Sequence, residues 1–413
     1  MCFSPDSSSK VRRAVFLAPE LGVPPRNGMA LKCATVLEAI SLDWRCHVIT
    51  PSESPFHPGV RYTAQDFRQC YPHADAFTIL DLPAVVFPRR QWRALNSALR
   101  LSSPSAARYL NDRGQRIVRN LLLRGSCEVV YCDLYPYVKC IPKVLLGRTL
   151  LSINDAHGLG FLRSAEATTK SWRKVVQAFR HRYYDHFENI TLRTVRAVHV
   201  VTQADKDYLI NRHQLDNVHV IPIAVGAAYF RARVQDYTSY RVLVHGEFTA
   251  EERRVAVTQF VKRAVARGYL GKVVWVLLGH GSAAMAREFP SASSIEALDY
   301  VDDHASLLAS CAYGIYPERA GSGTKNRIVQ HMAVGACVIT TPEMLRGIPG
   351  AQEGQHLLVA SSADGQVDLL ASALEGPIKS AEIGGAGRSF CREAFAPSRV
   401  GQQWRDLFDL VSK

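Results

Sequence analysis

Hydrophobic and polar positions along this chain alternate between two kinds of pattern. Short apolar, β-branched runs predict buried strands, and segments with apolar residues three or four positions apart predict helices. Strands are expected at 14–18, 46–50, 128–132, 149–153, 197–201, 218–222, 240–246, 272–279, 294–301, 312–317 and 336–341. Helices are expected at 29–40, at about 170–193, near 252–267 and near 303–311. Another helix is expected to begin at Gln203, one is expected to end at Gly335, and further helices are expected in the last part of the chain. This alternation indicates parallel sheets covered by helices on both faces.

The length of 413 residues and the distribution of these elements predict an α/β fold with two Rossmann-like domains facing across a cleft. The pattern pauses at 221–230, which divides the strands into two sets of about six. We therefore expect an N-terminal domain at 1–225, a second domain at 226–390, and a C-terminal helix at 391–413 that packs back on the first domain. Ligands bind at the carboxyl ends of parallel strands. The loops expected to matter are 19–28, 245–252, 279–283 and 317–326.

The positive charge of the chain is concentrated in its first half. Residues 1–225 hold 30 Lys and Arg against 18 Asp and Glu, whereas residues 226–413 hold 20 against 19. Two stretches, 89–124 and 163–196, carry most of the excess. They fit either solvated helix faces or a surface for an anionic partner such as a bilayer or an anionic substrate. Aromatic residues do not interleave with these arginines and no nucleic-acid motif is present, so nucleic acid is not expected as a partner.

Cysteine usage and hydropathy bear on the location of the protein. The ten cysteines are scattered without a CxxC pair, and the closest group is Cys127, Cys132 and Cys140. They are expected to be buried or free thiols in a reducing compartment. The chain shows no run of 18 apolar residues and no signal-peptide pattern at its start. These features lead us to expect a cytoplasmic protein. Peripheral contact with the inner face of the membrane is a further expectation.

The stretch GSGTKNRIVQHMAVGACVITT, residues 321–341, predicts a glycine-rich loop, a helix and a strand. The first amides of a helix lack partners and its dipole is positive there, so a helix N-terminus attracts anions. Glycines allow the backbone to approach a phosphate closely. Gly323, Thr324 and Lys325 therefore suit a phosphate site, with Lys325 as the cation, although a plain helix cap fits the local pattern too. The spacing is not that of a Walker loop.

In its wider context this stretch resembles the donor-binding segment of the group 1 nucleotide-sugar glycosyltransferases, which have the GT-B fold. The family pattern is a strand ending in Pro, a G-x-G-x-K segment, a helix closed by Ala-x-Gly, and a strand followed by a later Gly. Three further segments carry the resemblance: YGIYPERAGSGTKNRIVQHMAVGACVITTPEMLRGI around the quoted stretch, VTQADKDYLINRHQLDNVHVIPIAVGAAYF at 201–230, and LAPELGVPPRNGMALKCATVLEAIS at 17–41.

The resemblance implies where the donor would bind. Lys325 and the amides of Gly323 and Thr324 would hold the nucleotide diphosphate, with Asn326 and Arg327 adding contacts. Gly28 would lie near the phosphates, and the loops holding Gly246 and His280 would approach the nucleotide. An arginine after the first strand of the second domain often helps in the family, and this position offers Arg253 or Arg254, which is expected to sit deep in a helix.

Two positions depart from the family pattern. The family usually has two glutamates eight positions apart, one contacting the sugar and one the ribose, and this chain has Ser322 and Gln330 there. Gln330 can still hydrogen-bond a ribose diol, without the strength of a carboxylate. Asp302 and Asp303 are interpreted as a helix cap rather than a metal motif. We therefore expect a site without a required metal, in which cations and a helix dipole stabilise the departing diphosphate.

His157 and Asp155 follow a strand of the first domain, where the family presents polar residues toward the acceptor or the sugar. One of them would orient or deprotonate the acceptor hydroxyl. The alternative is a capping Asp beside a packed His. Glu318 and Arg319 are weaker candidates.

Together these features predict a glycosyltransferase that moves a sugar from a nucleotide-diphosphate sugar to a glycan, glycolipid or lipid-linked saccharide, as in polysaccharide biosynthesis. By resemblance the transfer would be retaining. Two alternatives remain open: a non-catalytic nucleotide-sugar-binding protein, suggested by Ser322 and Gln330, and a nucleotide-sugar epimerase of the same fold. The sequence has no GxGxxG loop after the first strand, which argues against a dinucleotide-dependent oxidoreductase. It also has no carboxylate pair in the aligned loops, which an epimerase would be expected to show.

Overall fold

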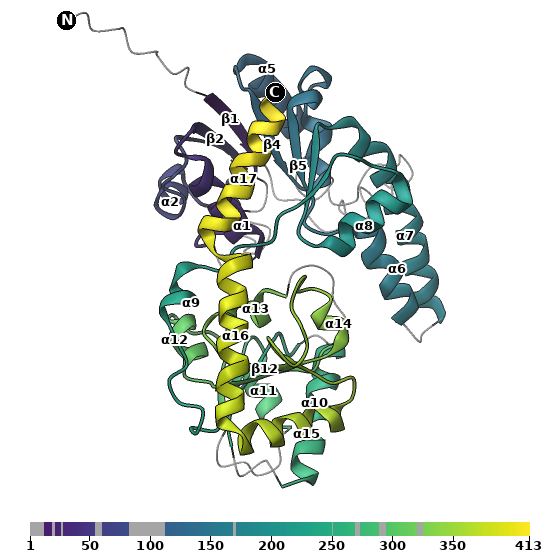
Figure 1. The fold of residues 1–413 in the computed structure, drawn as a ribbon. Coiled ribbons are helices and arrows are strands. Elements are labelled where there is room, and N and C mark those ends of the chain that lie inside the picture. The colour runs from purple at the N-terminus through teal and green to yellow at the C-terminus, as the bar shows by residue number, and fades with distance from the viewer. Residues whose placement is uncertain are drawn as a thin grey trace, which may run out of the picture. The chain divides into compact units, whose positions relative to one another are not determined.

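The computed structural model describes residues 12–18, 21–25, 28–53, 60–81, 112–167, 171–249, 251–268, 273–288, 295–319 and 325–413, apart from the side chains of 112, 136, 167, 172 and 173. Within these residues the chain divides into two compact units. Unit 1 comprises 1–201, 205–221 and 401–413, and unit 2 comprises 202–204 and 222–400. Each unit contains a parallel sheet (Figure 1), so the expected mixed α/β class is confirmed.

The described residues of unit 1 form a seven-stranded sheet with the order β3-β2-β1-β4-β5-β6-β7. The strands are β1 (Arg12–Leu17), β2 (Trp44–Pro51), β3 (Ala76–Leu80), β4 (Val129–Asp133), β5 (Thr149–Ser152), β6 (Ala197–Val200) and β7 (Val218–Val220). All six neighbouring pairs are parallel. The order reverses between β1 and β4. Because crossover connections are right-handed, helices before and after this reversal lie on opposite faces of the sheet.

The helices of unit 1 are α1 (Gly28–Ile40), α2 (Ala64–Cys70), α5 (Asp112–Arg124), α6 (His157–Ala167), α7 (Ser171–Thr191), most of α8 (Gln203–His213) and most of α17 (Pro397–Ser412). The described residues of unit 1 also include three 3-10 segments: η1 (Tyr135–Cys140) and η2 (Lys143–Arg148) lie between β4 and β5, and η3 (Leu192–Thr194) lies between α7 and β6. Helix α17 packs one apolar face on this sheet. Its Phe408 contacts Phe16 and Tyr131, with ring centroids 5.9 and 6.1 Å apart.

The described residues of unit 2 form a six-stranded parallel sheet with the order β10-β9-β8-β11-β12-β13. Its strands are β8 (Arg241–His245), β9 (Val274–Leu278), β10 (Ile295–Leu298), β11 (Tyr313–Tyr316), β12 (Cys337–Thr340) and β13 (Leu358–Val359). Its helices are α9 (Ala227–Arg231), α10 (Glu251–Ala266), α11 (Ser282–Ala286), α12 (His304–Ala309), α13 (Asn326–Ala333), α14 (Pro342–Leu345), α15 (Ala363–Glu375) and α16 (Pro377–Phe395). The order reverses between β8 and β11, which are hydrogen-bonded neighbours. A crevice for a ligand is expected at the carboxyl ends of these two strands.

Several expected features are present in the described residues. The nine cysteines there are free, and eight of them are buried, including Cys127, Cys132 and Cys140. Asp303 caps α12, since its side chain accepts a hydrogen bond from the Ser306 amide at 3.0 Å. Within the part of the chain that is described, no helix has both the length and the apolar character needed to cross a bilayer.

Candidate active site

The carboxyl ends of β8 and β11 in unit 2 carry a cluster of charged side chains. Strand β8 ends at His245 and leads through Gly246 into α10, and β11 ends at Tyr316 two residues before Glu318. Helix α13 begins at Asn326 after this second strand. The first turns of α10 and α13 therefore both start near the point where the strand order reverses, and the positive end of a helix dipole favours an anion.

One arginine from each of these first turns reaches the same carboxylate. Arg253 Nε lies 2.8 Å from Glu318 Oε1, and Arg327 Nη2 lies 3.1 Å from the same oxygen. The Glu318 side chain is buried, with 6% of its surface exposed, whereas 25% of Arg253 and 31% of Arg327 remain exposed. Two guanidinium groups thus face one buried carboxylate, and both arginines are still partly open to solvent.

Burial and mutual repulsion act on this pair of arginines. Desolvation, and then the nearby Arg327, lower the pKa of Arg253, while Glu318 raises it. Arg327 is further held by a hydrogen bond from its Nη1 to the carbonyl oxygen of His245 at the end of β8. Both side chains are therefore fixed before any ligand binds, which reduces the entropy lost on binding an anion.

Glycines make room for the two arginines at the end of β8. A Cβ atom on Gly246 would lie 2.5 Å from Arg253 Cδ and 2.7 Å from Arg327 Nη1. Gly279, after β9, has φ +128°, and a Cβ there would lie 1.9 Å from the Gly246 carbonyl oxygen. The loops are also joined by a hydrogen bond from the Phe248 amide to the His280 carbonyl oxygen, 2.9 Å long. Backbone from both loops therefore borders the arginine cluster, while the side chain of His280 is exposed.

Two histidines lie beneath the cluster. The ring of His245 is 5.0 Å from that of His304, which hydrogen-bonds through Nδ1 to the Tyr229 hydroxyl at 2.9 Å. Burial, followed by the charges of Arg327 and the proximity of His304, lowers the pKa of His245 well below its ordinary value. His245 is therefore neutral at pH 7 and adds no charge to the site.

The other predicted donor residues fall around the start of α13. Lys325 is the N-cap residue, and its backbone amide donates to the Gly347 carbonyl oxygen at 3.4 Å. Asn326 and Arg327 lie in the first turn, and Gln330 is a half-buried residue of the helix. Ser322, Gly323 and Thr324 lie outside the described residues. The role assigned to Lys325 thus stays a prediction, whereas the placement of Arg327 at the arginine cluster is a structural finding.

Of the two candidate arginines predicted after β8, Arg253 faces the strand ends and Arg254 does not. Helix α10 begins at Glu251, so Arg253 belongs to its first turn and is not too deep in the helix to reach the site. Arg254 instead lies 3.5 Å from Glu288 on the surface. The sequence did not reveal which arginine faces the strand ends, because that depends on the residue at which the helix starts.

In unit 1, the predicted catalytic pair lies between β5 and α6. His157 is the first residue of α6, and the amide of Asp155 donates to the Ile153 carbonyl oxygen at 2.7 Å. The His157 ring packs between Tyr184 and Tyr135, with centroids 5.1 Å from each. Burial lowers the pKa of His157, and the nearby Glu188 and Asp205 carboxylates oppose that effect. The ring is therefore neutral at pH 7. Gly28, the last predicted site residue of this unit, begins α1.

A second polar cluster of unit 1, missed by the sequence analysis, lies at the carboxyl ends of β4 and β5. Lys32 of α1 is buried, and its amine lies 2.6 Å from Asp133 Oδ1 and 2.7 Å from the Ser152 hydroxyl. Ser152 also hydrogen-bonds His199 Nδ1 at 2.9 Å. These groups satisfy one another, so the cluster joins α1 to three strands rather than presenting free groups to a ligand.

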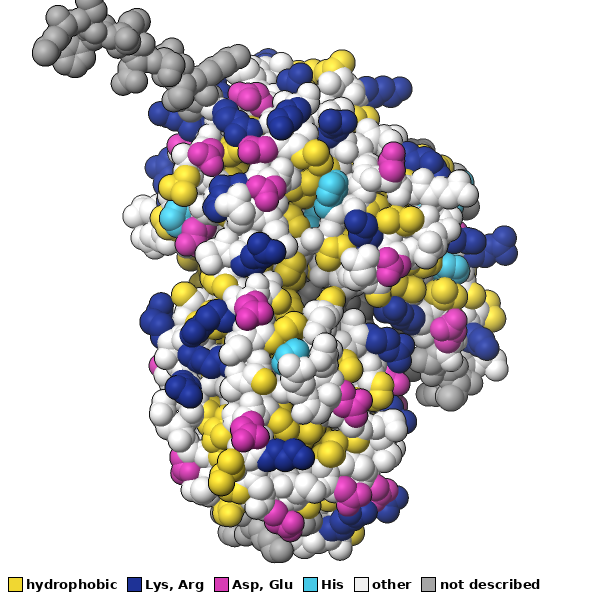
Figure 2. Space-filling model, viewed as in Figure 1, with side chains coloured by type: hydrophobic (Ala, Val, Ile, Leu, Met, Phe, Trp, Pro, Cys, Tyr) yellow, Lys and Arg dark blue, Asp and Glu magenta, His cyan; other side chains and the backbone are white. Residues whose placement is uncertain are grey.

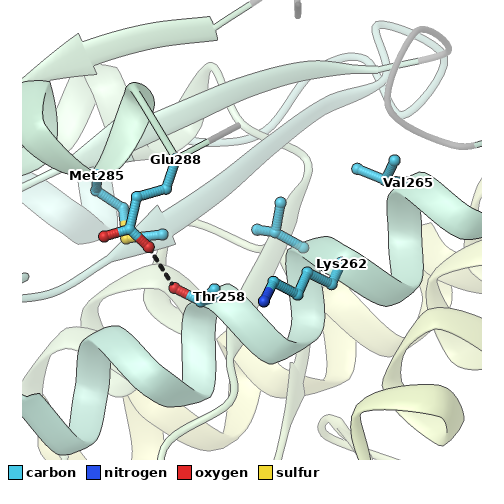
Figure 3. A pocket seen from close by; sticks show the side chains of 6 residues that line it. Thr258, Lys262, Val265, Met285 and Glu288 are labelled. Carbon is cyan, nitrogen blue, oxygen red and sulfur yellow. Dashed lines mark hydrogen bonds between the residues drawn. The ribbon is translucent and has the colours of Figure 1, made fainter. Parts of the chain in front are cut away.

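The described part of unit 2 also holds a cavity between α10 and α11 (Figure 3). It is lined by Thr258, Val261, Lys262, Val265, Met285 and Glu288. Thr258 donates to Glu288 Oε2 at 2.8 Å, and none of the predicted site residues lines it. Among the residues described, no group of three His, Cys, Asp or Glu side chains is placed to hold a metal ion.

Comparison with known proteins relates part of the chain to a family. Residues 239–376 match the family model described as "Glycosyl transferases group 1", and this segment contains β8, Gly246, Arg253, Glu318 and Arg327. The chain therefore carries a glycosyl transferases group 1 domain, and the expected family resemblance is confirmed. None of the curated proteins compared matches the chain significantly.

Solved structures with low sequence identity share the whole fold. A sucrose-phosphate synthase from Thermosynechococcus elongatus has 14% identity and a TM-score of 0.70, with 96% of this chain and 98% of that chain covered. HepE from Anabaena, solved with UDP-glucose, has 12% identity and a TM-score of 0.61, with 95% and 98% covered. A mutant of S. aureus TarM, solved with Fondaparinux, alpha-GlcNAc-glycerol and UDP, has 8% identity and a TM-score of 0.65, with 97% and 100% covered.

These similarities establish the two-domain GT-B fold, as expected from the sequence. The family match therefore covers part of unit 2, and the rest of the chain shares the fold of solved glycosyltransferases. Within unit 2, residues 239–376 belong to the group 1 type.

Proposed function

We propose that the protein transfers a sugar from a nucleotide-diphosphate sugar, bound by unit 2, to an acceptor hydroxyl bound by unit 1. The observation that carries this proposal is the convergence of Arg253 and Arg327 on Gly246 and Glu318 at the carboxyl ends of β8 and β11. Cleavage of the bond between sugar and phosphate leaves a nucleoside diphosphate with additional negative charge. Two fixed guanidinium groups and two helix N-termini would stabilise that charge as it develops.

Donor recognition follows from the same geometry. Arg327 and Arg253 bind the diphosphate, with Lys325 and the amides of Gly323 and Thr324 completing the contacts. Gln330 hydrogen-bonds the ribose, and the backbone of the loops at Gly246 and His280 borders the nucleotide. Because cations can supply the electrostatic stabilisation, the reaction needs no metal in this proposal. The structures of HepE with UDP and with UDP-glucose make a uridine nucleotide the first candidate to test.

The acceptor proposal rests on unit 1. The neutral His157 ring accepts the proton of the acceptor hydroxyl or orients it together with Asp155. The excess of basic residues in 1–225 favours an anionic glycan or a lipid-linked saccharide. The proposal also includes retention of anomeric configuration, a role in polysaccharide synthesis, and peripheral contact of the basic unit 1 with the inner face of an anionic membrane.

Calorimetric titration of UDP, GDP, ADP and CMP into the full chain tests the donor site. We expect one nucleoside diphosphate to bind, and both Arg327→Ala and Lys325→Ala to weaken it by about tenfold or more, or 1.4 kcal/mol. Arg254→Ala, a neighbouring arginine that faces Glu288, is the matched control and should change nothing. Absence of nucleotide binding in the wild type overturns the proposal.

A turnover assay then separates an enzyme from a binding protein. Release of nucleoside diphosphate from the sugar nucleotide that binds, in the presence of acceptor and with EDTA added, is the expected result. The non-catalytic alternative is favoured specifically by Ser322 and Gln330, which replace the two usual carboxylates. Tight donor binding with no release under any acceptor would support that alternative.

A further inference from the structure

The N-terminal half of α7 carries an exposed apolar surface with basic residues on both sides. Val175, Val176 and Phe179 are 70%, 40% and 65% exposed. At positions i, i+1 and i+4 they share one side of the helix. Lys174, Arg180 and Arg182 surround them and are exposed as well. We call these six residues the α7 surface, and Figure 2 shows hydrophobic and basic side chains gathered in the region that α7 occupies in Figure 1.

The C-terminal half of the same helix is fixed to the body of unit 1. Tyr183 and Phe187 are buried, and Glu188 accepts hydrogen bonds from the Tyr135 hydroxyl at 2.6 Å and the Gly158 amide at 3.1 Å. Asp185, the acidic residue closest to the α7 surface in sequence, is bonded through both of its oxygens to Arg212 at 2.9 Å. The anchored half thus holds the exposed half rigidly, and Asp185 is neutralised by Arg212.

The length and direction of α7 place the exposed half beyond the sheet. A helix of 21 residues is about 30 Å long, whereas a four-residue strand such as β5 spans about 13 Å. Because α7 leads into the start of β6, its first half extends past the carboxyl edge of the sheet, the edge that also carries His157. A partner bound by the α7 surface would therefore lie on the side of unit 1 where the acceptor is expected.

We propose that the α7 surface docks unit 1 on an anionic lipid bilayer, with the apolar residues entering the headgroup region. A helix with an apolar side and flanking Lys and Arg has the composition that lies in such an interface, because the aliphatic stems reach apolar depth while the charges contact lipid phosphates. Charge complementarity selects the anionic bilayer over a neutral one. This inference rests on the proposed membrane contact of unit 1 and assigns it to one helix.

Flotation of the full chain with vesicles of phosphatidylcholine alone, or with 30% phosphatidylglycerol, tests the assignment. We expect binding to the anionic vesicles, a marked loss of binding at 0.5 M salt, and little binding to neutral vesicles. Val175→Ser with Phe179→Ser should reduce the partition coefficient by tenfold or more. Lys174→Gln, Arg180→Gln and Arg182→Gln together should reduce it by about fivefold for each cation removed. Leu42→Ser with Arg45→Gln, on exposed positions beside the start of β2, is the matched control and should bind as wild type does.

Other outcomes overturn the proposal in distinguishable ways. If all variants bind equally, the membrane surface lies elsewhere, and equal binding to neutral vesicles would exclude recognition of anionic headgroups. Self-association of the wild type that disappears in the Val175→Ser, Phe179→Ser variant would identify a second copy as the occupant. Circular dichroism shows whether each variant folds. If the serine variant does not fold, the variant with Lys174→Gln, Arg180→Gln and Arg182→Gln tests the proposal in its place. Nucleotide titration of the same samples shows separately whether the donor site is intact.

Discussion

The guanidinium Nε of Arg253 lies 2.8 Å from Oε1 of Glu318, which joins the first turn of α10 to the residue that follows β11 by two positions. Arg327 contacts the same oxygen from the first turn of α13. A buried carboxylate therefore separates two cations that would otherwise repel one another. In the proposed reaction, a bound diphosphate brings further negative charge to the same place, so Glu318 and the ligand share the task of neutralising the arginines.

Replacing Glu318 by Gln should make unit 2 less stable and more dependent on an anion. The change removes the charge that compensates two partly buried arginines, and breaking a buried ion pair costs about 3 kcal/mol. Pyrophosphate should then raise the melting temperature of Glu318→Gln by more than it raises that of the wild type, as measured by thermal shift. Glu343→Gln, whose carboxylate pairs on the surface with Arg346, is the control. Equal shifts in Glu318→Gln and wild type would show that the arginines do not respond to the charge of Glu318.

Gly246→Ala should weaken nucleotide binding while the chain still folds. The new Cβ would come within 2.7 Å of both arginine side chains and would push them from the positions that their bonds to Glu318 and His245 hold, so the loss falls on the arginines rather than on the sheet. We expect a decrease in nucleoside diphosphate affinity of about tenfold, since displaced cations lose charge-assisted hydrogen bonds. Gly385→Ala in α16, where a Cβ meets nothing within 4 Å, is the matched control and should leave affinity unchanged. Unchanged affinity in Gly246→Ala would place the diphosphate elsewhere.

Much of the fold could be predicted because buried parallel strands produce continuous apolar runs. The run at 240–246 became β8 at Arg241–His245, and the run at 312–317 became β11 at Tyr313–Tyr316. Strands β3 and β13 were not predicted. Both lie at sheet edges, β3 is only partly buried, and β13 has two residues, so neither provides the continuous apolar pattern on which the prediction depends.

The candidate site was less predictable because its members meet only in three dimensions. Glu318 and Arg253 are distant in sequence, and no local pattern shows that they form an ion pair. His331 shows the same limit for a single side chain. The structure buries it completely, with Nε2 donating to the Cys311 carbonyl oxygen at 2.9 Å. A histidine inside an apolar helical pattern gives no sign of which environment it will have.

The buried ion pair of unit 1 should be sensitive to loss of one partner. Lys32→Met leaves the Asp133 carboxylate buried without its cation, and we expect a loss of about 3–5 kcal/mol in the free energy of unfolding, measured in urea. The double variant Lys32→Met, Asp133→Leu should recover part of that loss, because no buried charge remains. Arg61→Met breaks the exposed pair with Asp81 at 3.1 Å and should change little. If Lys32→Met costs no more than Arg61→Met, the buried pair does not stabilise the fold.

Acid should destabilise unit 2 through His331. Burial lowers the pKa of His331 to about 4, against an ordinary value of 6.5, because the enclosed ring is not solvated when charged, and the hydrogen bond to the Cys311 carbonyl opposes this shift only in part. The unfolded chain therefore binds the proton more readily, so this contribution to stability is complete above pH 6.5. It decreases as the pH falls from about 6.5 to about 4, and its full size is roughly 3 kcal/mol. Urea unfolding across this range should show a smaller decrease for His331→Gln than for the wild type. His280→Gln, which removes an exposed ring after β9, should leave the wild-type pH dependence intact. Parallel curves for His331→Gln and wild type would mean that another group, such as the buried His199 of unit 1, is responsible for the acid sensitivity.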